Sequence, residues 1–116
     1  MTLPLLKIRS RRQTPKQPRR SWPAHLAYVA EQGCCVPGCR NPANVHHLRL
    51  PGTDACAGRR SSDRFAVGLC RAHHQGQNGL HHCGDEAAWW ARIGVDPMAE
   101  AAMLWDASVR EGRVRV

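Results

Sequence analysis

The apolar positions along the chain recur first at helical spacing and then at strand spacing. Trp22, Leu26 and Val29 lie on or near one face of a helix that is predicted over residues 21–31, with Pro23 in its first turn. Apolar residues at this spacing form a single stripe on a helix. We therefore expect this helix to pack its stripe against the rest of the protein.

Two short apolar runs that follow the helix predict a pair of strands. The first strand is expected over residues 43–50 and the second over residues 64–69. The segment between them, residues 51–62, combines proline, glycine and serine and is therefore predicted to be a loop. His46 and His47 are neighbours on the first strand, so their side chains should point to opposite faces and have different tasks.

Helix signals dominate the remaining part of the chain. A helix should begin at Cys70 and can break at Gly76 and Gly79, because each glycine costs about 1 kcal/mol relative to alanine. Asp and Pro cap signals predict two more helices, over residues 86–93 and 97–110. We expect these two helices to form a hairpin over the strands, with apolar bulk from Trp89, Trp90, Ile93, Met98, Ala102 and Trp105. The predicted fold class is α+β.

Length and charge change this picture mainly at the amino-terminal end. A chain of 116 residues forms one domain with a marginal core, which a bound metal ion would stabilise. The formal net charge is +8, and residues 1–22 hold seven basic side chains and no acidic one. We therefore predict a disordered basic arm over residues 1–20 and a folded domain over residues 21–116.

The cations of the arm suit the phosphates of a nucleic acid, and such binding weakens steeply with salt. A solubilising tail and a localisation signal are the alternatives for the arm. Arg59 and Arg60 are a second candidate phosphate contact, with a solvated surface pair as the alternative. The predicted nucleic-acid-binding residues are Lys7, Arg9, Arg11, Arg12, Lys16, Arg19, Arg20, Arg59 and Arg60.

Six cysteines are present, and they raise the choice between disulfides and a metal site. Three disulfides would suit a secreted protein. However, the apolar run from Leu3 to Leu6 is interrupted by Pro4 and is too short for a signal peptide, and no stretch is long enough to span a membrane. We therefore expect a cytoplasmic protein with reduced thiolates on a metal ion.

The spacing of cysteine and histidine predicts where that ion binds. Cys70 and His73 are three residues apart, so both can reach one ion from the first turn of a helix. The other two ligands would be Cys39 and either Cys34 or Cys35, on a tight turn. Four ligands of Cys3His type suit a structural, tetrahedral zinc ion. We prefer Cys34, and the spacing alone leaves Cys35 open.

The next histidine on that helix points elsewhere. His74 is rotated by about 100° from His73 and can reach a different site, so that one helix would serve two metal ions. If the helix continues, His81 lies on the same face as His74, seven residues away. If it breaks, either His81 or His82 can face inward, and we prefer His81.

These motifs carry a family resemblance that covers about residues 32–106. The chain resembles the zinc-containing HNH endonucleases in Cys34-Cys-Val-Pro-Gly-Cys39, Val45-His-His-Leu48, and Asp63 leading into Gly68-Leu-Cys-Arg-Ala-His-His74. Its later part looks like phage and prophage members similar to recombination-enhancement (Ref-like) nucleases, in Leu80-His-His-Cys-Gly-Asp-Glu-Ala-Ala-Trp-Trp90, Gly94-Val-Asp-Pro97 and Leu104-Trp105.

The resemblance implies a zinc-stabilised, treble-clef-like ββα-metal unit that hydrolyses phosphodiester bonds in DNA. By resemblance, His47 is the general base, while His46 and His74 hold a catalytic Mg²⁺ or another divalent ion, with His81 as the third ligand. Asp63 stands where the family often has asparagine. It therefore either orients His47 or helps to bind the ion.

Partners and the competing function follow from the same motifs. Resemblance to Ref-like proteins implies a phage or prophage protein in a bacterial host that acts with a RecA-type recombinase filament. The competing function is a non-catalytic, zinc-stabilised module that binds DNA or protein. The histidines beyond the four structural ligands favour a nuclease, since a binding module needs no second imidazole cluster.

Overall fold

The computed structural model describes residues 20–115 of the chain. The predicted basic arm, apart from Arg20, lies outside the described residues. The same holds for the predicted phosphate contacts Lys7, Arg9, Arg11, Arg12, Lys16 and Arg19.

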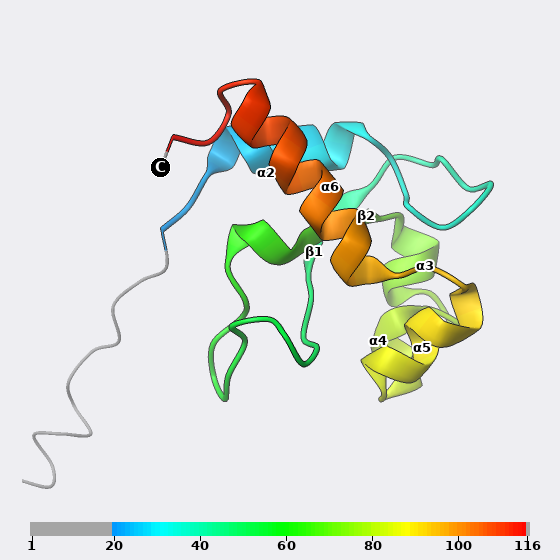
Figure 1. Ribbon diagram of the computed structural model, residues 1–116. Helices are drawn as coiled ribbons and strands as arrows, with labels where there is room; N and C mark the ends of the chain where they lie inside the picture. Colours follow the sequence, from blue (N-terminus) through cyan, green and yellow to red (C-terminus); the bar gives the residue numbers. More distant parts are fainter. Residues whose placement is uncertain (1–19, 116) are drawn as a thin grey trace, which may run out of the picture.

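The described part is a mixed α+β fold, as predicted, in which helices surround a two-stranded sheet (Figure 1). None of its helices is long and apolar enough to cross a membrane. In chain order its elements are α2 (Pro23–Glu31), β1 (Asn44–His47), the 3-10 turn η1 (Asp63–Phe65), β2 (Ala66–Leu69), α3 (Arg71–Gln75), α4 (Leu80–Cys83), α5 (Glu86–Ile93) and α6 (Pro97–Arg110).

The sheet is antiparallel and shorter than the predicted strands. β1 pairs with β2 so that Asn44 lies opposite Leu69 and His47 lies opposite Ala66. The pairing ends there because the chain forms η1 before β2, where the sequence predicted one continuous strand over residues 64–69. All four residues of β2 are buried, and α2, α3 and α6 pack on it. The sheet therefore lies at the centre of the protein.

Gly68 shows how closely α2 approaches the sheet. A Cβ atom at this position would lie 2.8 Å from the carbonyl oxygen of Gly33 and 3.2 Å from that of Val29. Both atoms belong to the backbone and cannot move aside easily. Glycine at this point of β2 therefore allows the end of α2 to pack directly on the strand.

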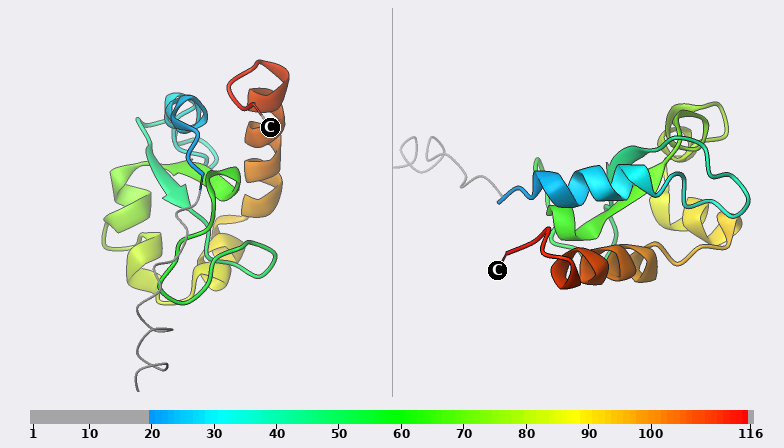
Figure 2. Two further views of the ribbon diagram at one scale, coloured as in Figure 1. Left: turned by 90° about the vertical axis from the view of Figure 1, so that its left-hand side faces the viewer. Right: turned by 90° about the horizontal axis from the view of Figure 1, so that it is seen from above.

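The two carboxyl-terminal helices do not form the predicted hairpin. α5 packs on α4, whereas α6 packs on η1, β2 and α2, and runs alongside α2 (Figure 2). Ala102, which was predicted to face the core, is exposed, and Ala101 and Leu104 are buried instead. Trp89 and Trp90 are buried as predicted, with exposed fractions of 1% and 2%.

The predicted helix boundaries in this half are confirmed. The side chain of Asp85 accepts a hydrogen bond from the backbone N–H of Ala88, and Asp96 caps α6 in the same way. Gly94 ends α5 in a left-handed conformation, with φ of 80°. The helix that begins after Cys70 breaks at Gly76, so that α3 and α4 are separate short helices.

Candidate metal centres

Within residues 20–115, two groups of side chains have the composition and spacing of metal-ligand sets. The first is the cysteine cluster, and the second is the histidine cluster. In each cluster one ligand atom per residue lies within 4.8 Å of all the others. The cysteine cluster consists of Cys34, Cys39, Cys70 and His73, and the histidine cluster consists of His46, His74 and His81.

Distances in the cysteine cluster match a tetrahedral site. The Sγ atoms of Cys39 and Cys70 are 3.7 Å apart, and Nδ1 of His73 lies 3.2 Å from Sγ of Cys70 and 3.4 Å from Sγ of Cys34. Around one tetrahedral zinc ion, two sulfur ligands lie about 3.8 Å apart and a sulfur and a nitrogen ligand about 3.6 Å apart. The four side chains therefore lie close enough together to hold one metal ion.

Local structure brings these four ligands together. The turn that carries Cys34 and Cys39 is closed by backbone hydrogen bonds, from Cys34 N to Asn41 O at 2.9 Å and from Cys39 N to Val36 O at 3.0 Å. Cys70 follows directly after β2 and is the N-cap residue of α3, and His73 lies in the first turn of that helix. Cys70 and His73 thus reach the same cluster from the start of α3, as their three-residue spacing predicted.

The thiols of this cluster differ in acidity. Burial raises the pKa of Cys34 to about 11. Burial also opposes ionisation of Cys70, but hydrogen bonds from the backbone N–H of His73 and from neighbouring groups lower the pKa of Cys70 to about 7. Cys70 therefore supplies a thiolate more readily than Cys34 does, and a bound cation would promote ionisation of Cys34.

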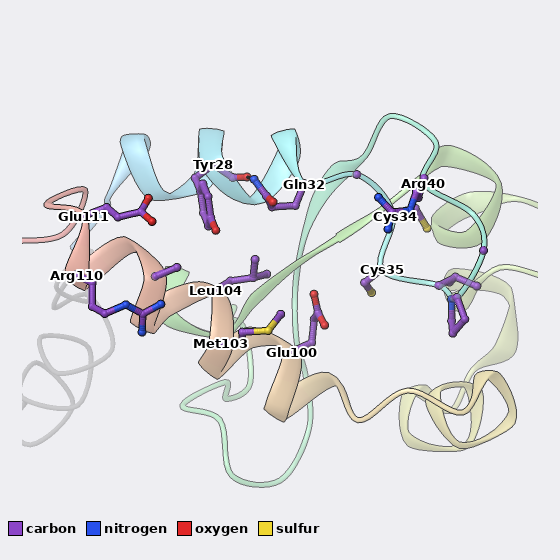
Figure 3. A pocket seen from close by; sticks show the side chains of 15 residues that line it. Tyr28, Gln32, Cys34, Cys35, Arg40, Glu100, Met103, Leu104, Arg110 and Glu111 are labelled. Carbon is purple, nitrogen blue, oxygen red and sulfur yellow. Dashed lines mark hydrogen bonds between the residues drawn. The ribbon is translucent and has the colours of Figure 1, made fainter.

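The structure distinguishes Cys34 from Cys35. Cys34 belongs to the cysteine cluster, whereas Cys35 lines a groove of about 530 Å³ between α2, the cysteine turn and α6. Figure 3 shows the Cys35 sulfur facing the carboxylate of Glu100 across this groove. Burial, together with the charge of Glu100, raises the pKa of Cys35 to about 12. Cys35 therefore remains a protonated thiol outside the cluster.

Three elements contribute to the histidine cluster: β1 carries His46, α3 carries His74 and α4 carries His81. Nδ1 of His46 lies 3.2 Å from Nε2 of His74, and the rings of His74 and His81 have centroids 4.2 Å apart. Two imidazole nitrogens on one ion lie about 3.0 to 3.4 Å apart. His46 and His74 are buried and His81 is exposed, so the cluster opens to solvent on the His81 side.

His82 is not a member of this cluster. It is exposed on α4 and lines a shallow hollow with Gln77 and Asn78. The turn at Gly79 therefore directs the first histidine of the doublet, and not the second, toward His46 and His74. This arrangement agrees with the preference for His81.

Glu86 is a residue of the site that the sequence analysis missed. Its Oε2 atom lies 3.0 Å from Nε2 of His46 and accepts a hydrogen bond from Nε1 of Trp90 at 3.1 Å. Its Oε1 atom accepts from the backbone N–H of Arg49. Burial alone raises the pKa of Glu86, but these contacts, that with His46 foremost, lower it below its usual value. The carboxylate thus favours a proton on Nε2 of His46 and leaves Nδ1 to face the cluster.

The environment of His74 keeps its imidazole neutral. Burial, together with the neighbouring rings of His46 and His81, lowers the pKa of His74 to about 4. A neutral imidazole is the form that binds metal ions. Nε2 of His74 is the atom that faces His46. Nδ1 of His74 is buried and has no hydrogen-bond partner among the described residues.

His47 lies on the other face of β1 and has a separate partner. Its Nε2 atom is 2.9 Å from Oδ1 of Asp63, a carboxylate that is almost completely buried at the start of η1. The other oxygen of Asp63 accepts a hydrogen bond from the backbone N–H of Trp22 at 2.8 Å. Of the two roles predicted for Asp63, the geometry favours orienting His47, since Asp63 is not in the histidine cluster.

Three of the predicted phosphate contacts fall within the described residues, namely Arg20, Arg59 and Arg60. Arg60 extends into solvent, with one guanidinium nitrogen 3.9 Å from Asp63. Arg59 pairs through its backbone with Cys56 in the loop after β1. The guanidinium of Arg20 lies 5.1 Å from the centre of the Trp22 ring and donates a hydrogen bond to the backbone of Arg115.

Fold and site together define a small α+β protein with a sulfur-rich and an imidazole-rich metal-ligand cluster. The chain belongs to the family described as "Protein of unknown function (DUF968)", which matches residues 10–112. No curated protein and no solved structure matches it. The resemblance to HNH and Ref-like nucleases, and with it the phage origin and the cytoplasmic location, therefore stays a prediction.

Proposed function

We propose that this protein is a metal-dependent endonuclease that hydrolyses phosphodiester bonds in DNA with an HNH, or ββα-metal, arrangement of residues. The observation that carries the proposal is the division of labour between adjacent histidines on β1. His46 faces an open imidazole cluster, and His47 faces a buried carboxylate. Phosphodiester hydrolysis needs both functions, charge neutralisation and a general base.

His47 is the general base in this proposal. Asp63 accepts a hydrogen bond from Nε2–H of His47, which leaves the lone pair on Nδ1 to take a proton from the attacking water. The carboxylate then stabilises the imidazolium that forms, as the aspartate beside the catalytic histidine does in serine hydrolases. Because Asp63 is also held by the backbone of Trp22, it keeps the His47 ring in one orientation.

His46, His74 and His81 are the proposed ligands of the catalytic ion. When bound, a divalent ion there supplies charge neutralisation for the phosphoryl oxygens and for the leaving 3′ oxygen. The exposed side of the cluster, at His81, is where a phosphate can approach. Three imidazoles favour transition-metal ions over Mg²⁺, which prefers oxygen ligands. We therefore propose Zn²⁺, Ni²⁺ or Mn²⁺ ahead of Mg²⁺.

The cysteine cluster has a structural role in this proposal and would hold a zinc ion. With four protein ligands, a tetrahedral ion there would have no position left for substrate. By joining the cysteine turn to the start of α3, it fixes His73 and therefore also its neighbour His74. Cys34, Cys39, Cys70 and His73 would thus, with an ion bound, help to position His74 in the histidine cluster.

A plasmid-nicking assay tests the proposal. Wild-type protein and His47→Ala would be compared with Mg²⁺, Mn²⁺, Ni²⁺ and Zn²⁺, with His82→Ala as the matched control, since His82 is an exposed histidine outside the cluster. We expect His47→Ala to lose nicking by about 10²- to 10⁴-fold while it binds DNA like the wild type. His82→Ala should nick normally.

The same assay distinguishes the competing functions. A protein that binds DNA with strong salt dependence but cuts with none of the ions would be a zinc-stabilised DNA-binding module. A protein without salt-dependent DNA affinity would be a protein-interaction module. Dependence on a RecA-type recombinase filament is tested by adding the filament to the same reaction and measuring whether nicking increases.

A further inference from the structure

A cavity on the His47 side of the protein has a lining that neither cluster uses. It has a volume of about 530 Å³ and lies between the start of α2, the loop after β1, η1 and α6. We call it the aromatic pocket. Its aromatic and basic lining residues are Arg20, Trp22, Arg64, Phe65 and Trp105.

Aromatic rings form much of the wall of this pocket. Trp22 and Trp105 meet edge to face, with ring centroids 5.0 Å apart and an angle of 82° between the rings. Both tryptophans and Phe65 are only partly buried, in contrast to Trp89 and Trp90 in the core. Partly exposed rings around a cavity offer surface on which a flat, apolar group can stack.

Positive charge accompanies these rings. The Arg20 guanidinium lies 5.1 Å from the centre of the Trp22 ring, and Arg64 is exposed in η1. Aromatic side chains interleaved with arginine are the combination that binds single-stranded nucleic acid, in which bases stack on rings and guanidinium groups meet phosphates. The lining also includes Asp54, whose Oδ1 atom accepts a hydrogen bond from the backbone N–H of Ser62, so that two arginines against one carboxylate leave the lining with a net positive charge.

The pocket is joined to the proposed general base through Asp63. Ser62 and Arg64 line the pocket, and Asp63 between them contacts His47. Asp63 also accepts a hydrogen bond from the backbone N–H of Trp22, which lies in the pocket wall. In Figure 1 the start of α2 accordingly lies beside the turn that contains η1. The residues that surround Asp63 and hold it against His47 therefore also form part of the pocket wall.

We propose that the aromatic pocket binds an unpaired nucleobase of a DNA strand, next to the phosphodiester at His47. The position next to a cleaved bond rests on the proposed function, whereas the binding itself does not. Bases within a duplex are stacked on one another and cannot present a face to the rings. The substrate is therefore single-stranded DNA, or duplex DNA in which a base has left the stack.

Tryptophan fluorescence measures this binding without cleavage. A short single-stranded DNA would be titrated into His47→Ala protein, with the blunt duplex and the RNA of the same sequence as comparisons. Trp22 and Trp105 line the pocket, and Trp89 and Trp90 are shielded in the core, so stacking should quench only the first pair. We expect single-stranded DNA to quench the emission at concentrations at which the duplex does not.

Two variants test the pocket directly. Phe65→Leu keeps apolar bulk but removes a stacking face, and Arg64→Gln removes a cation from an exposed site that packing does not depend on. Each should weaken binding of the single strand by about tenfold. Arg110→Gln is the control, because Arg110 is an exposed arginine outside this pocket. Circular dichroism would verify that all variants are folded.

The outcomes separate this inference from the proposed function. Quenching by single strands without nicking by the wild type would support the proposed base-binding pocket and contradict the proposed nuclease function. Three results would contradict the base-binding pocket but not the nuclease function. They are nicking without quenching, equal quenching by the duplex, and undiminished binding by both Phe65→Leu and Arg64→Gln. Quenching by RNA alone would overturn the assignment to DNA.

Discussion

Glu86 determines which ring nitrogen of His46 faces the histidine cluster. Its carboxylate lies 3.0 Å from Nε2 of His46, so that Nδ1 is the atom that faces His74. Carboxylates behind metal-binding histidines fix the tautomer and make the imidazole a stronger ligand. We therefore expect Glu86→Gln to weaken binding of a transition-metal ion to the histidine cluster by about 10- to 100-fold. Calorimetric titration with Mn²⁺ or Ni²⁺, after the cysteine cluster has been loaded with zinc, measures this change.

The control for this change is Glu31→Gln, which removes the same charge from an exposed position at the end of α2. It should leave the titration unaltered. Equal affinities for wild type and Glu86→Gln would show that Glu86 has no influence on the cluster. Thermal unfolding of both variants verifies that the comparison is between folded proteins.

The distance between partners along the chain explains which residues of the site could be predicted. Cys70 and His73 are one helical turn apart, and the opposite orientation of His46 and His47 follows from the alternation of side chains on a strand. Both predictions need only local geometry. The contacts from His46 to Glu86 and from Trp22 to Asp63 join residues 40 and 41 positions apart, and no local pattern indicates them.

Among the elements, α3 depends most on the cysteine cluster. It has only five residues, too few to be stable as an isolated helix, and it ends at Gly76. Cys70 caps it and His73 lies in its only full turn. A metal ion that joins these residues to the cysteine turn therefore stabilises α3, and with it the position of His74.

Cys39→Ser tests this dependence, because Cys39 lies on the turn and not on α3 itself. We expect the variant to lose its bound zinc and to melt at a temperature lower by more than about 10 °C, if it retains a cooperative transition. Metal analysis and thermal unfolding by circular dichroism provide the measurements. Cys56→Ser, at an exposed cysteine outside the cluster, should keep both the zinc and the melting temperature. A zinc-loaded, fully stable Cys39→Ser protein would contradict the assignment.

Element boundaries were predictable where a side chain marks them, and packing was not. Asp85 and Asp96 accept hydrogen bonds from the first turns of α5 and α6, so the residues that start these helices are readable from the sequence. Where each helix packs depends on distant parts of the chain. α6 contacts η1, β2 and α2 rather than α5, and its buried face follows Ala101 and Leu104, which shifts Ala102 to solvent.

Across the whole molecule, α3 connects two clusters of different chemistry. His73 belongs to the sulfur-rich cluster and His74 to the imidazole cluster, because neighbouring residues on a helix point about 100° apart. Three sulfurs and one nitrogen form a soft, four-ligand set that would suit a tightly bound zinc ion. Three imidazoles with an exposed side form a weaker and more accessible set.

This difference predicts two separate steps when metal ions are removed. A chelator of moderate strength should first remove the ion from the histidine cluster, which opens to solvent at His81, so that nicking is lost while the melting temperature changes by less than about 2 °C. A stronger chelator should then remove zinc from the cysteine cluster and unfold the protein, since that ion joins the cysteine turn to α3. Nicking, bound-zinc content and thermal unfolding would be followed in parallel along the chelator series.

The order in which nicking and the fold are lost and recovered tests whether the two clusters are separate sites. Restoring Mn²⁺ or Ni²⁺ after the first step should restore nicking at once, because the folded cluster is intact. Restoring zinc after the second step should recover nicking only as the fold recovers. If activity and fold are instead lost together at every chelator strength, a single ion serves both purposes, and His46, His74 and His81 do not form a separate catalytic site.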